Sequence, residues 1–122
     1  MKLYLGSIKL IQKAINTIYQ EGEVVIVGRG GQAILKNKPG VLHVRIEAPL
    51  KKRVKYVQKK EQLSHIVAQE LVTERDRAAA AYLKRFYNID WTDSLFYHLV
   101  INTAHWKIGT AANLIADAVK YI

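Results

Sequence analysis

The chain has 122 residues, a length that suits one domain and is too short for two. Half of the residues are apolar and 24% are charged, so the chain can bury a core and does not have the composition of a disordered protein. Its formal charge of +9 predicts attraction to anionic partners such as nucleotides or nucleic acid. The absence of Cys excludes disulfides, thiolate metal sites and a Cys nucleophile.

The first 21 residues are expected to form a helix that ends near Gly22. Lys9 and Lys13 interrupt its apolar residues and no small-residue cleavage site follows, so we do not expect a signal peptide. No apolar run approaches the length of a membrane span, and we expect a cytoplasmic protein without a membrane partner. Four apolar residues at steps of three and four line one face of this helix: Ile8, Ile11, Ile15 and Ile18.

Three short apolar runs predict the strands of a parallel sheet. Val24–Val27 is β-branched without alternation, which is typical of a strand buried on both faces. The other two runs are Val41–Ile46 and Leu99–Ile101. Thirteen residues, Gly28 to Gly40, separate the first two runs and suit a short helical crossover. These patterns predict an α/β fold with three layers, a short parallel sheet flanked by helices, and a helical lid segment.

The remaining patterns predict helices. Pro49 suits the first turn of a basic helix that turns Val54 and Val57 inward. The pattern then stays helical from Leu63 to Tyr87, and a last helix begins near Thr110. The single expected domain therefore divides into a helix at 1–21, strand, crossover and strand at 22–50, basic and lid-like helices at 51–93, and the last strand and helix at 94–122.

Ligands of parallel sheets bind outside the carboxyl ends of the strands. The expected strand ends are followed by residues 28–31, by Glu47-Ala48 and by Asn102-Thr103. In the first of these, glycines permit a tight turn, and Arg29 offers a planar fork that suits a phosphate or a base. A flexible turn with a solvated arginine is the alternative. No Gly-Lys-Ser/Thr occurs, so the sequence contains no loop that would cradle a nucleoside triphosphate.

Two basic clusters suggest phosphate contacts. Residues 51–60 hold six cations and no acid, which indicates either a solvated surface or contact with a nucleotide or nucleic acid. Residues 74–77, followed by Lys84-Arg85, mix acids with arginines. Converging cations of this kind can neutralise phosphoryl oxygens, whereas internal pairing of Asp76 with a neighbouring cation is the alternative.

Other chemistry has little support in the sequence. Seven of the eleven aromatic residues lie between Tyr82 and Trp106, where they form either a packed core or lid or a surface that stacks bases. We expect no metal site and name no catalytic residue, since no Ser-His-Asp arrangement has support. The four histidines lack the spacing of metal ligands: His43, His65, His98 and His105.

Five segments, in this order, resemble the cytidylate kinase-like family of P-loop nucleoside monophosphate kinases. The resemblance covers most of residues 22–122 and implies phosphoryl transfer from ATP with Mg²⁺ to a nucleoside monophosphate such as CMP. ATP and Mg²⁺ are implied by this resemblance alone. The matching segments are GRGGQAIL (28–35), LHVRIEAPLKKR (42–53), ERDR (74–77), KRFYNIDWTD (84–93) and LVINT (99–103).

The resemblance also implies a set of phosphate-binding residues. Gly28 and Arg29 match the glycine-arginine pair that faces the monophosphate, and Arg53 matches an arginine that opens the following helix. Gly30 stands where cytidylate kinases have an Asp, which puts base recognition in question. The complete implied set is Gly28, Arg29, Gly30, Arg53, Arg75, Asp76, Arg77, Lys84 and Arg85.

The family's first strand, phosphate-binding loop and second strand have no counterpart in the sequence. In the family the first strand lies between the strands that correspond to 24–27 and 42–46, so this chain lacks a central neighbour for both. Unpaired buried backbone groups would cost about 1–3 kcal/mol each. Three remedies are direct pairing of the two strands, a strand lent by another chain, and residues upstream.

We therefore expect a truncated relative, either a fragment or a homo-oligomer that shares a strand, which binds nucleotides weakly and does not turn over ATP alone. The alternative is a basic module that binds nucleic acid, or a structural or interaction domain.

Overall fold

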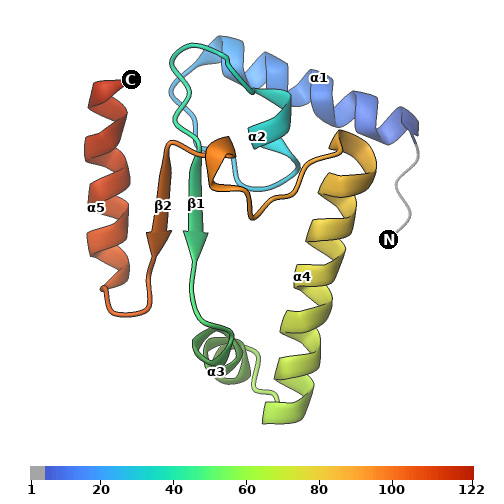
Figure 1. Ribbon diagram of the computed structural model, residues 1–122, viewed down its shortest axis with the longest axis vertical. Helices are drawn as coiled ribbons and strands as arrows, with labels where there is room; N and C mark the ends of the chain where they lie inside the picture. The colour runs from blue at the N-terminus through green and yellow to red at the C-terminus, as the bar shows by residue number, and fades with distance from the viewer. Residues whose placement is uncertain (1–4) are drawn as a thin grey trace.

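Helices make up most of the chain, and its two strands are short (Figure 1). The computed structural model describes residues 5–122. In chain order the elements are α1 (Leu5–Glu21), α2 (Gly31–Ile34), β1 (Val44–Glu47), α3 (Leu50–Lys60), α4 (His65–Tyr87), the 3₁₀ turn η1 (Ser94–Phe96), β2 (Leu99–Asn102), α5 (Ile108–Ala118) and the 3₁₀ turn η2 (Val119–Tyr121).

The two strands form a parallel sheet, in register from Val44 opposite Leu99 to Glu47 opposite Asn102. The amide of Thr103 donates to the Glu47 carbonyl at 2.9 Å, which extends the pairing just past the strands. In Figure 1, α5 and α4 flank the strand pair on opposite sides, while α1 crosses at one end and α3 at the other. The predicted fold class, a short parallel sheet flanked by helices, is confirmed.

The prediction of a first strand at Val24–Val27 is wrong. These residues form no strand, and none of their backbone groups makes a hydrogen bond to the part of the chain that the structure describes. Val25 and Val27 are 91% and 86% exposed. A β-branched apolar run favours extended backbone, but a strand also needs a hydrogen-bonded neighbour, and β1 does not pair with this run. Direct pairing, the first of the three remedies, therefore does not occur.

Helix α1 confirms its predicted apolar face. Ile8 and Ile15 are 2% and 5% exposed, and the helix ends before Gly22, whose φ of 75° breaks the helical conformation. The first four residues of the predicted helix lie outside the described residues. None of the helices between residues 5 and 122 combines the length and the hydropathy needed to span a bilayer.

Helices α3 and α4 form a hairpin around a small core of Val54, Ala68 and Val72, each at most 5% exposed. The Ser64 hydroxyl caps α4 by accepting from the amide of Val67 at 3.3 Å. Asn88 ends the helix in a left-handed conformation, with φ 52°. The predicted helical stretch from 63 to 87 is thus confirmed except for its first two residues, and the inward side of α3 is as predicted.

A stacked histidine pair lies just before the strands. The rings of His43 and His98 are 5.5 Å apart and 16° from parallel, and the His43 amide donates to His98 Nδ1 at 2.9 Å. His43 Nε2 lies 3.2 Å from the Leu35 carbonyl. Burial lowers the pKa of His43, assisted by His98 and opposed by the Leu35 carbonyl. The fold therefore favours the neutral imidazole.

Acid should therefore weaken the fold through His43. Because its folded-state pKa lies below the ordinary value of 6.5, the contribution of His43 is complete above that pH and is lost as the pH falls through the folded-state pKa. We expect the free energy of unfolding in urea to drop between about pH 7.5 and about pH 5.5, and to drop less in His43→Gln. Equal drops in both proteins would contradict this assignment.

Candidate functional site

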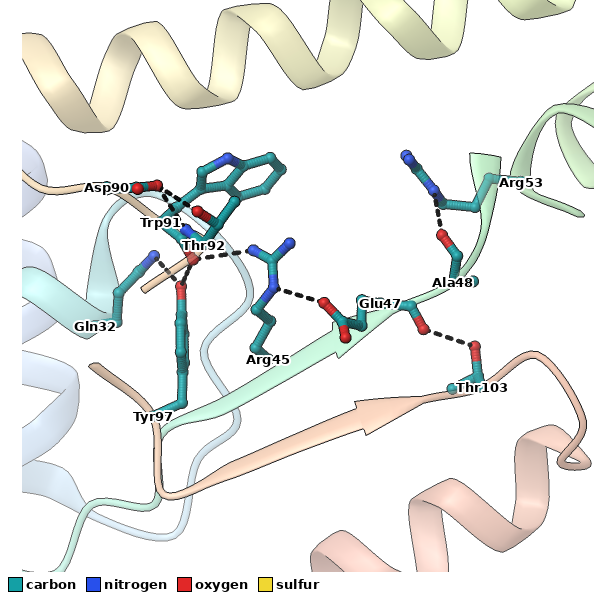
Figure 2. A network of polar contacts seen from close by, with 10 residues as sticks. All are labelled: Gln32, Arg45, Glu47, Ala48, Arg53, Asp90, Trp91, Thr92, Tyr97 and Thr103. Atoms are coloured by element: carbon teal, nitrogen blue, oxygen red, sulfur yellow. Dashed lines mark hydrogen bonds and ion pairs between the residues drawn. The ribbon is translucent and has the colours of Figure 1, made fainter. Parts of the chain in front are cut away.

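The carboxyl ends of β1 and β2 lie at Glu47 and Asn102, and α3 begins three residues beyond β1. Figure 2 shows two arginines, Arg45 from β1 and Arg53 from α3, on the side of β1 that faces α4. We refer to Arg45 and Arg53 together as the arginine pair. Arg53 lies beyond the carboxyl end of β1, where parallel sheets bind ligands, and Arg45 lies within the strand, two residues before its end.

Arg45 makes three contacts with neighbouring side chains and backbone. Its guanidinium lies 4.8 Å from the centroid of the Trp91 ring, and its Nη1 donates to the Trp91 carbonyl at 3.0 Å. Its Nε donates to Glu47 Oε2 at 3.2 Å. The Tyr97 hydroxyl donates to the same Trp91 carbonyl at 2.7 Å, and Gln32 reaches that hydroxyl at 3.4 Å. This network ties β1 to α2 and to the loop after α4 (Figure 2).

Arg53 connects three elements. Its Nε donates to the Ala48 carbonyl at 3.0 Å, and its Nη1 lies 2.9 Å from both carboxylate oxygens of Asp76 on α4. The internal pairing of Asp76, which the sequence left as an alternative, is therefore present. Both side chains are more than a third exposed, so solvent screens their attraction.

Each arginine of the arginine pair has N–H donors for which the described residues provide no acceptor. Among residues 5–122, the Nη2 groups of Arg45 and Arg53 have no acceptor within hydrogen-bond distance. A guanidinium presents its five N–H donors in one plane, a geometry that matches the oxygens of a carboxylate or phosphate. Because protein contacts already fix Nε and Nη1, the free Nη2 groups are positioned in advance for an oxyanion.

The turn at 28–31 lies against the C-terminal end of α4. Gly28, Arg29 and Gly30 all have positive φ, of 74°, 59° and 76°. A Cβ on Gly30 would lie 2.7 Å from the Tyr87 ring, so an aspartate does not fit there without movement of that ring. Burial raises the pKa of Tyr82, with a further rise from Tyr87 and a smaller opposing effect of Arg29. Arg29 therefore lies near Tyr82, at the same end of α4 as the Trp91 network.

Two of the predicted arginines point elsewhere. Arg75 donates to both carboxylate oxygens of Glu61 at 3.1 and 3.2 Å, in the turn between α3 and α4. Arg77 pairs with Glu74 at 3.0 Å on its own helix. It lies on an exposed face of α4 together with Ile66, Gln69, Glu70, Thr73 and Glu74. The predicted set therefore does not converge on one point in this conformation.

The last two predicted cations lie near the end of α4. Arg85 stacks on Phe86, 5.2 Å from the ring centroid. The pKa of Asp90 is lowered mainly by hydrogen bonds from Thr92, with smaller contributions from Arg45 and Lys84, which places Lys84 close to this loop. No phosphate-binding role of either cation follows from these contacts.

Sequence reasoning missed Arg45 and Trp91. The available clue was a charged residue in the middle of an apolar strand, on the side shared with His43. Three aromatics near the end of α4 contact one another: the ring centroids of Tyr82 and Phe86 are 5.3 Å apart, and those of Tyr82 and Tyr87 are 6.1 Å apart.

Metal binding has no geometric support in the part of the chain that the structure describes. No three His, Cys, Asp or Glu residues there gather closely enough to hold an ion.

On α3 the five lysines of the basic cluster are exposed, and the side chain of Lys52 donates to the Ala104 carbonyl. The exposed lysines are Lys51, Lys52, Lys55, Lys59 and Lys60.

Comparisons with known proteins give a consistent result. A sequence profile described as "Cytidylate kinase-like family" matches residues 6–105. Cytidylate kinase from Methanocaldococcus jannaschii is 34% identical over 105 residues, which cover 84% of this chain and 58% of that protein. Cytidylate kinase from Thermococcus kodakarensis is 37% identical over 103 residues, covering 84% and 52%. The chain thus spans a little over half the length of these curated relatives.

The fold also has a solved counterpart. The crystal structure of an uncharacterized protein from Eubacterium ventriosum superposes with a TM-score of 0.82 at 22% identity. The match covers 95% of this chain and 64% of that one. At this identity the similarity concerns the fold alone.

Proposed function

Because this chain belongs to the cytidylate kinase-like family, we propose that it binds a nucleoside monophosphate, of which CMP is the first candidate, between the carboxyl end of β1 and α4. The observation that carries the proposal is the arginine pair, whose two Nη2 groups are free on the α4 side of β1. The phosphate accepts hydrogen bonds from both guanidinium groups.

The other implied cations take secondary roles. Arg29 extends the positive field toward the end of α4, where its turn contacts Tyr87. Arg75 and Arg77 can contact the phosphate once their ion pairs with Glu61 and Glu74 break. Breaking them costs little, because exposed ion pairs of this kind stabilise by only about 0.2–1 kcal/mol. Lys84 and Arg85 stay nearby at the end of α4.

Phosphoryl transfer needs groups that these residues do not supply. The 122 residues contain no Gly-x-x-x-x-Gly-Lys-Ser/Thr, so they offer no backbone cradle for ATP and no hydroxyl for its Mg²⁺. We infer that this chain alone binds its nucleotide without phosphorylating it. A cytoplasmic location and a strand shared between copies of the chain also remain proposals.

A second candidate rests on α3. Its five exposed lysines form a surface without an acid, as expected of a helix that contacts the phosphates of nucleic acid. In that case affinity falls steeply with salt, because each phosphate contact releases counterions. Binding at the arginine pair involves the phosphate of one nucleotide. The affinity at this site should therefore depend little on whether the ligand is a mononucleotide or a longer nucleic acid.

A direct comparison separates the two candidates. We expect CMP and a ten-nucleotide oligomer to bind with similar affinity per site, and the affinity of each to fall by less than about tenfold between about 50 and about 200 mM salt. Fluorescence anisotropy and calorimetry at both salt concentrations provide the measurement. An oligomer that binds far more tightly than CMP at low salt, and loses about a thousandfold at high salt, would favour nucleic acid.

A further inference from the structure

A small hollow lies at the amino ends of the two strands, the end of the sheet near α2 in Figure 1. Its walls come from three segments: residues 36–38 after α2, His43 immediately before β1, and residues 95–98, which lead into β2. The hollow has a volume of about 290 Å³, at the small end of the range for ligand pockets, and therefore suits a small ligand. None of its residues belongs to the arginine pair.

The residues that line the hollow include cations and hydrogen-bond donors but no carboxylate. Two of them are lysines and two are histidines: Lys36, Lys38, His43 and His98. Both lysines are exposed, and neither forms an ion pair in the part of the chain that the structure describes. A concave surface whose positive charge is not neutralised by neighbouring acids attracts an anion.

The two lysines lie on a loop that the fold anchors at several points. The Leu35 carbonyl, on a residue only 4% exposed, accepts from the Lys38 amide at 3.1 Å and lies 3.2 Å from His43 Nε2. Further along the loop, the Tyr19 hydroxyl of α1 donates to the Pro39 carbonyl at 3.0 Å. These hydrogen bonds tie the loop both to α1 and to the histidine that begins the opposite wall.

His98 offers a ring N–H without a partner. Its Nδ1 accepts from the His43 amide at 2.9 Å, so the neutral ring carries its proton on Nε2. No acceptor for that N–H lies within hydrogen-bond distance among residues 5–122. Lys36 Nζ lies 5.0 Å from the centroid of the Phe96 ring, which lines the same hollow. Ammonium and imidazole donors from different walls thus border one space.

We propose that this hollow binds a phosphate group, free or carried by a small organic molecule, through Lys36, Lys38 and the Nε2–H of His98. A phosphate accepts several charge-assisted hydrogen bonds at once, and its negative charge matches the two lysines. The lack of a carboxylate in the lining argues against a metal ion or an amine as the ligand. This site is separate from the proposed nucleotide function and does not depend on it.

NMR of the histidine ring protons tests the site. Sodium phosphate and glycerol phosphate are titrated separately at constant pH, with sodium chloride keeping the ionic strength constant. We expect the ring signals of His98, identified by their absence in His98→Phe, to shift and saturate with at least one of the two ligands. The tighter ligand shows whether the group is bound free or as an ester. Arg53→Met should give the same dissociation constant as the wild type, because Arg53 lies outside the hollow.

Charge removal gives a second test. The double variant Lys36→Met, Lys38→Met should raise the dissociation constant at least about tenfold, because it removes two charged donors. The matched control is Lys9→Met, Lys13→Met, which removes the same charge from exposed positions on α1. The control should stay within about twofold of the wild type, and circular dichroism checks that every variant folds.

Three results would overturn the proposal. The first is a wild type whose His98 signals do not move with either ligand. The second is equal weakening by the two double variants, since the attraction would then come from the overall charge of +9 and not from the hollow. The third is a shift that disappears in Arg53→Met, which would assign the bound phosphate to the arginine pair.

Discussion

Mixed with ATP, Mg²⁺ and CMP, the purified chain is expected to form no CDP at the rate of an ordinary kinase, roughly 1–100 s⁻¹. Phosphoryl transfer depends on positioning the phosphates and neutralising their charge, and the 122 residues contain no Gly-x-x-x-x-Gly-Lys-Ser/Thr sequence for that purpose. Chromatographic separation of CMP from CDP over time measures the rate. A cytidylate kinase that carries this loop, assayed in parallel, serves as the positive control.

Turnover within the ordinary range would show that other residues grip the triphosphate. A rate below detection, together with measurable CMP binding, is the outcome that the proposed function requires.

Replacement of Arg53 by methionine is expected to weaken CMP binding by at least about tenfold, because loss of a charged donor to a phosphate costs about 2 kcal/mol or more. The free energy of unfolding should fall by only about 0.2–1 kcal/mol, since the pair with Asp76 is partly exposed. Calorimetry gives the first quantity and urea unfolding the second.

Two further variants make the Arg53 experiment specific. Lys55→Met removes an exposed cation from the same helix and should leave CMP affinity nearly unchanged. Arg53→Lys keeps the charge but loses the planar fork, and should recover only part of the affinity. If Lys55→Met and Arg53→Met weakened binding equally, the basic surface of α3 rather than the arginine pair would be the binding site.

Much of the fold could be predicted from local sequence patterns. The helices between 5 and 21 and between 65 and 87 follow apolar periodicity and their end signals, and β2 follows a short β-branched run. Helical periodicity is a local property, so the sequence alone reveals it. Pairing is not local. The run at 24–27 has a stronger strand composition than β1, yet among residues 5–122 only β1 has a hydrogen-bonded neighbouring strand.

The site was predictable only in part, for the same reason. Arg53 and Asp76 are 23 residues apart and meet because α3 and α4 form a hairpin. Arg75, one residue from Asp76, lies on another face of α4 and pairs with Glu61 instead. The Trp91–Arg45 contact joins positions that are 46 residues apart in sequence, so spacing along the chain gives no hint of it. A motif indicates which residue types gather, whereas packing decides which of them meet.

Calorimetric titration with CMP and with cytidine tests most directly whether the arginine pair holds a phosphate. The two ligands share base and sugar and differ only in the phosphate, to which Arg45 and Arg53 are expected to donate. We predict that CMP binds at least about tenfold more tightly than cytidine, and that Arg53→Met removes most of this difference. Equal affinity for the two ligands, or a preference for CMP that survives in Arg53→Met, would contradict the proposed site.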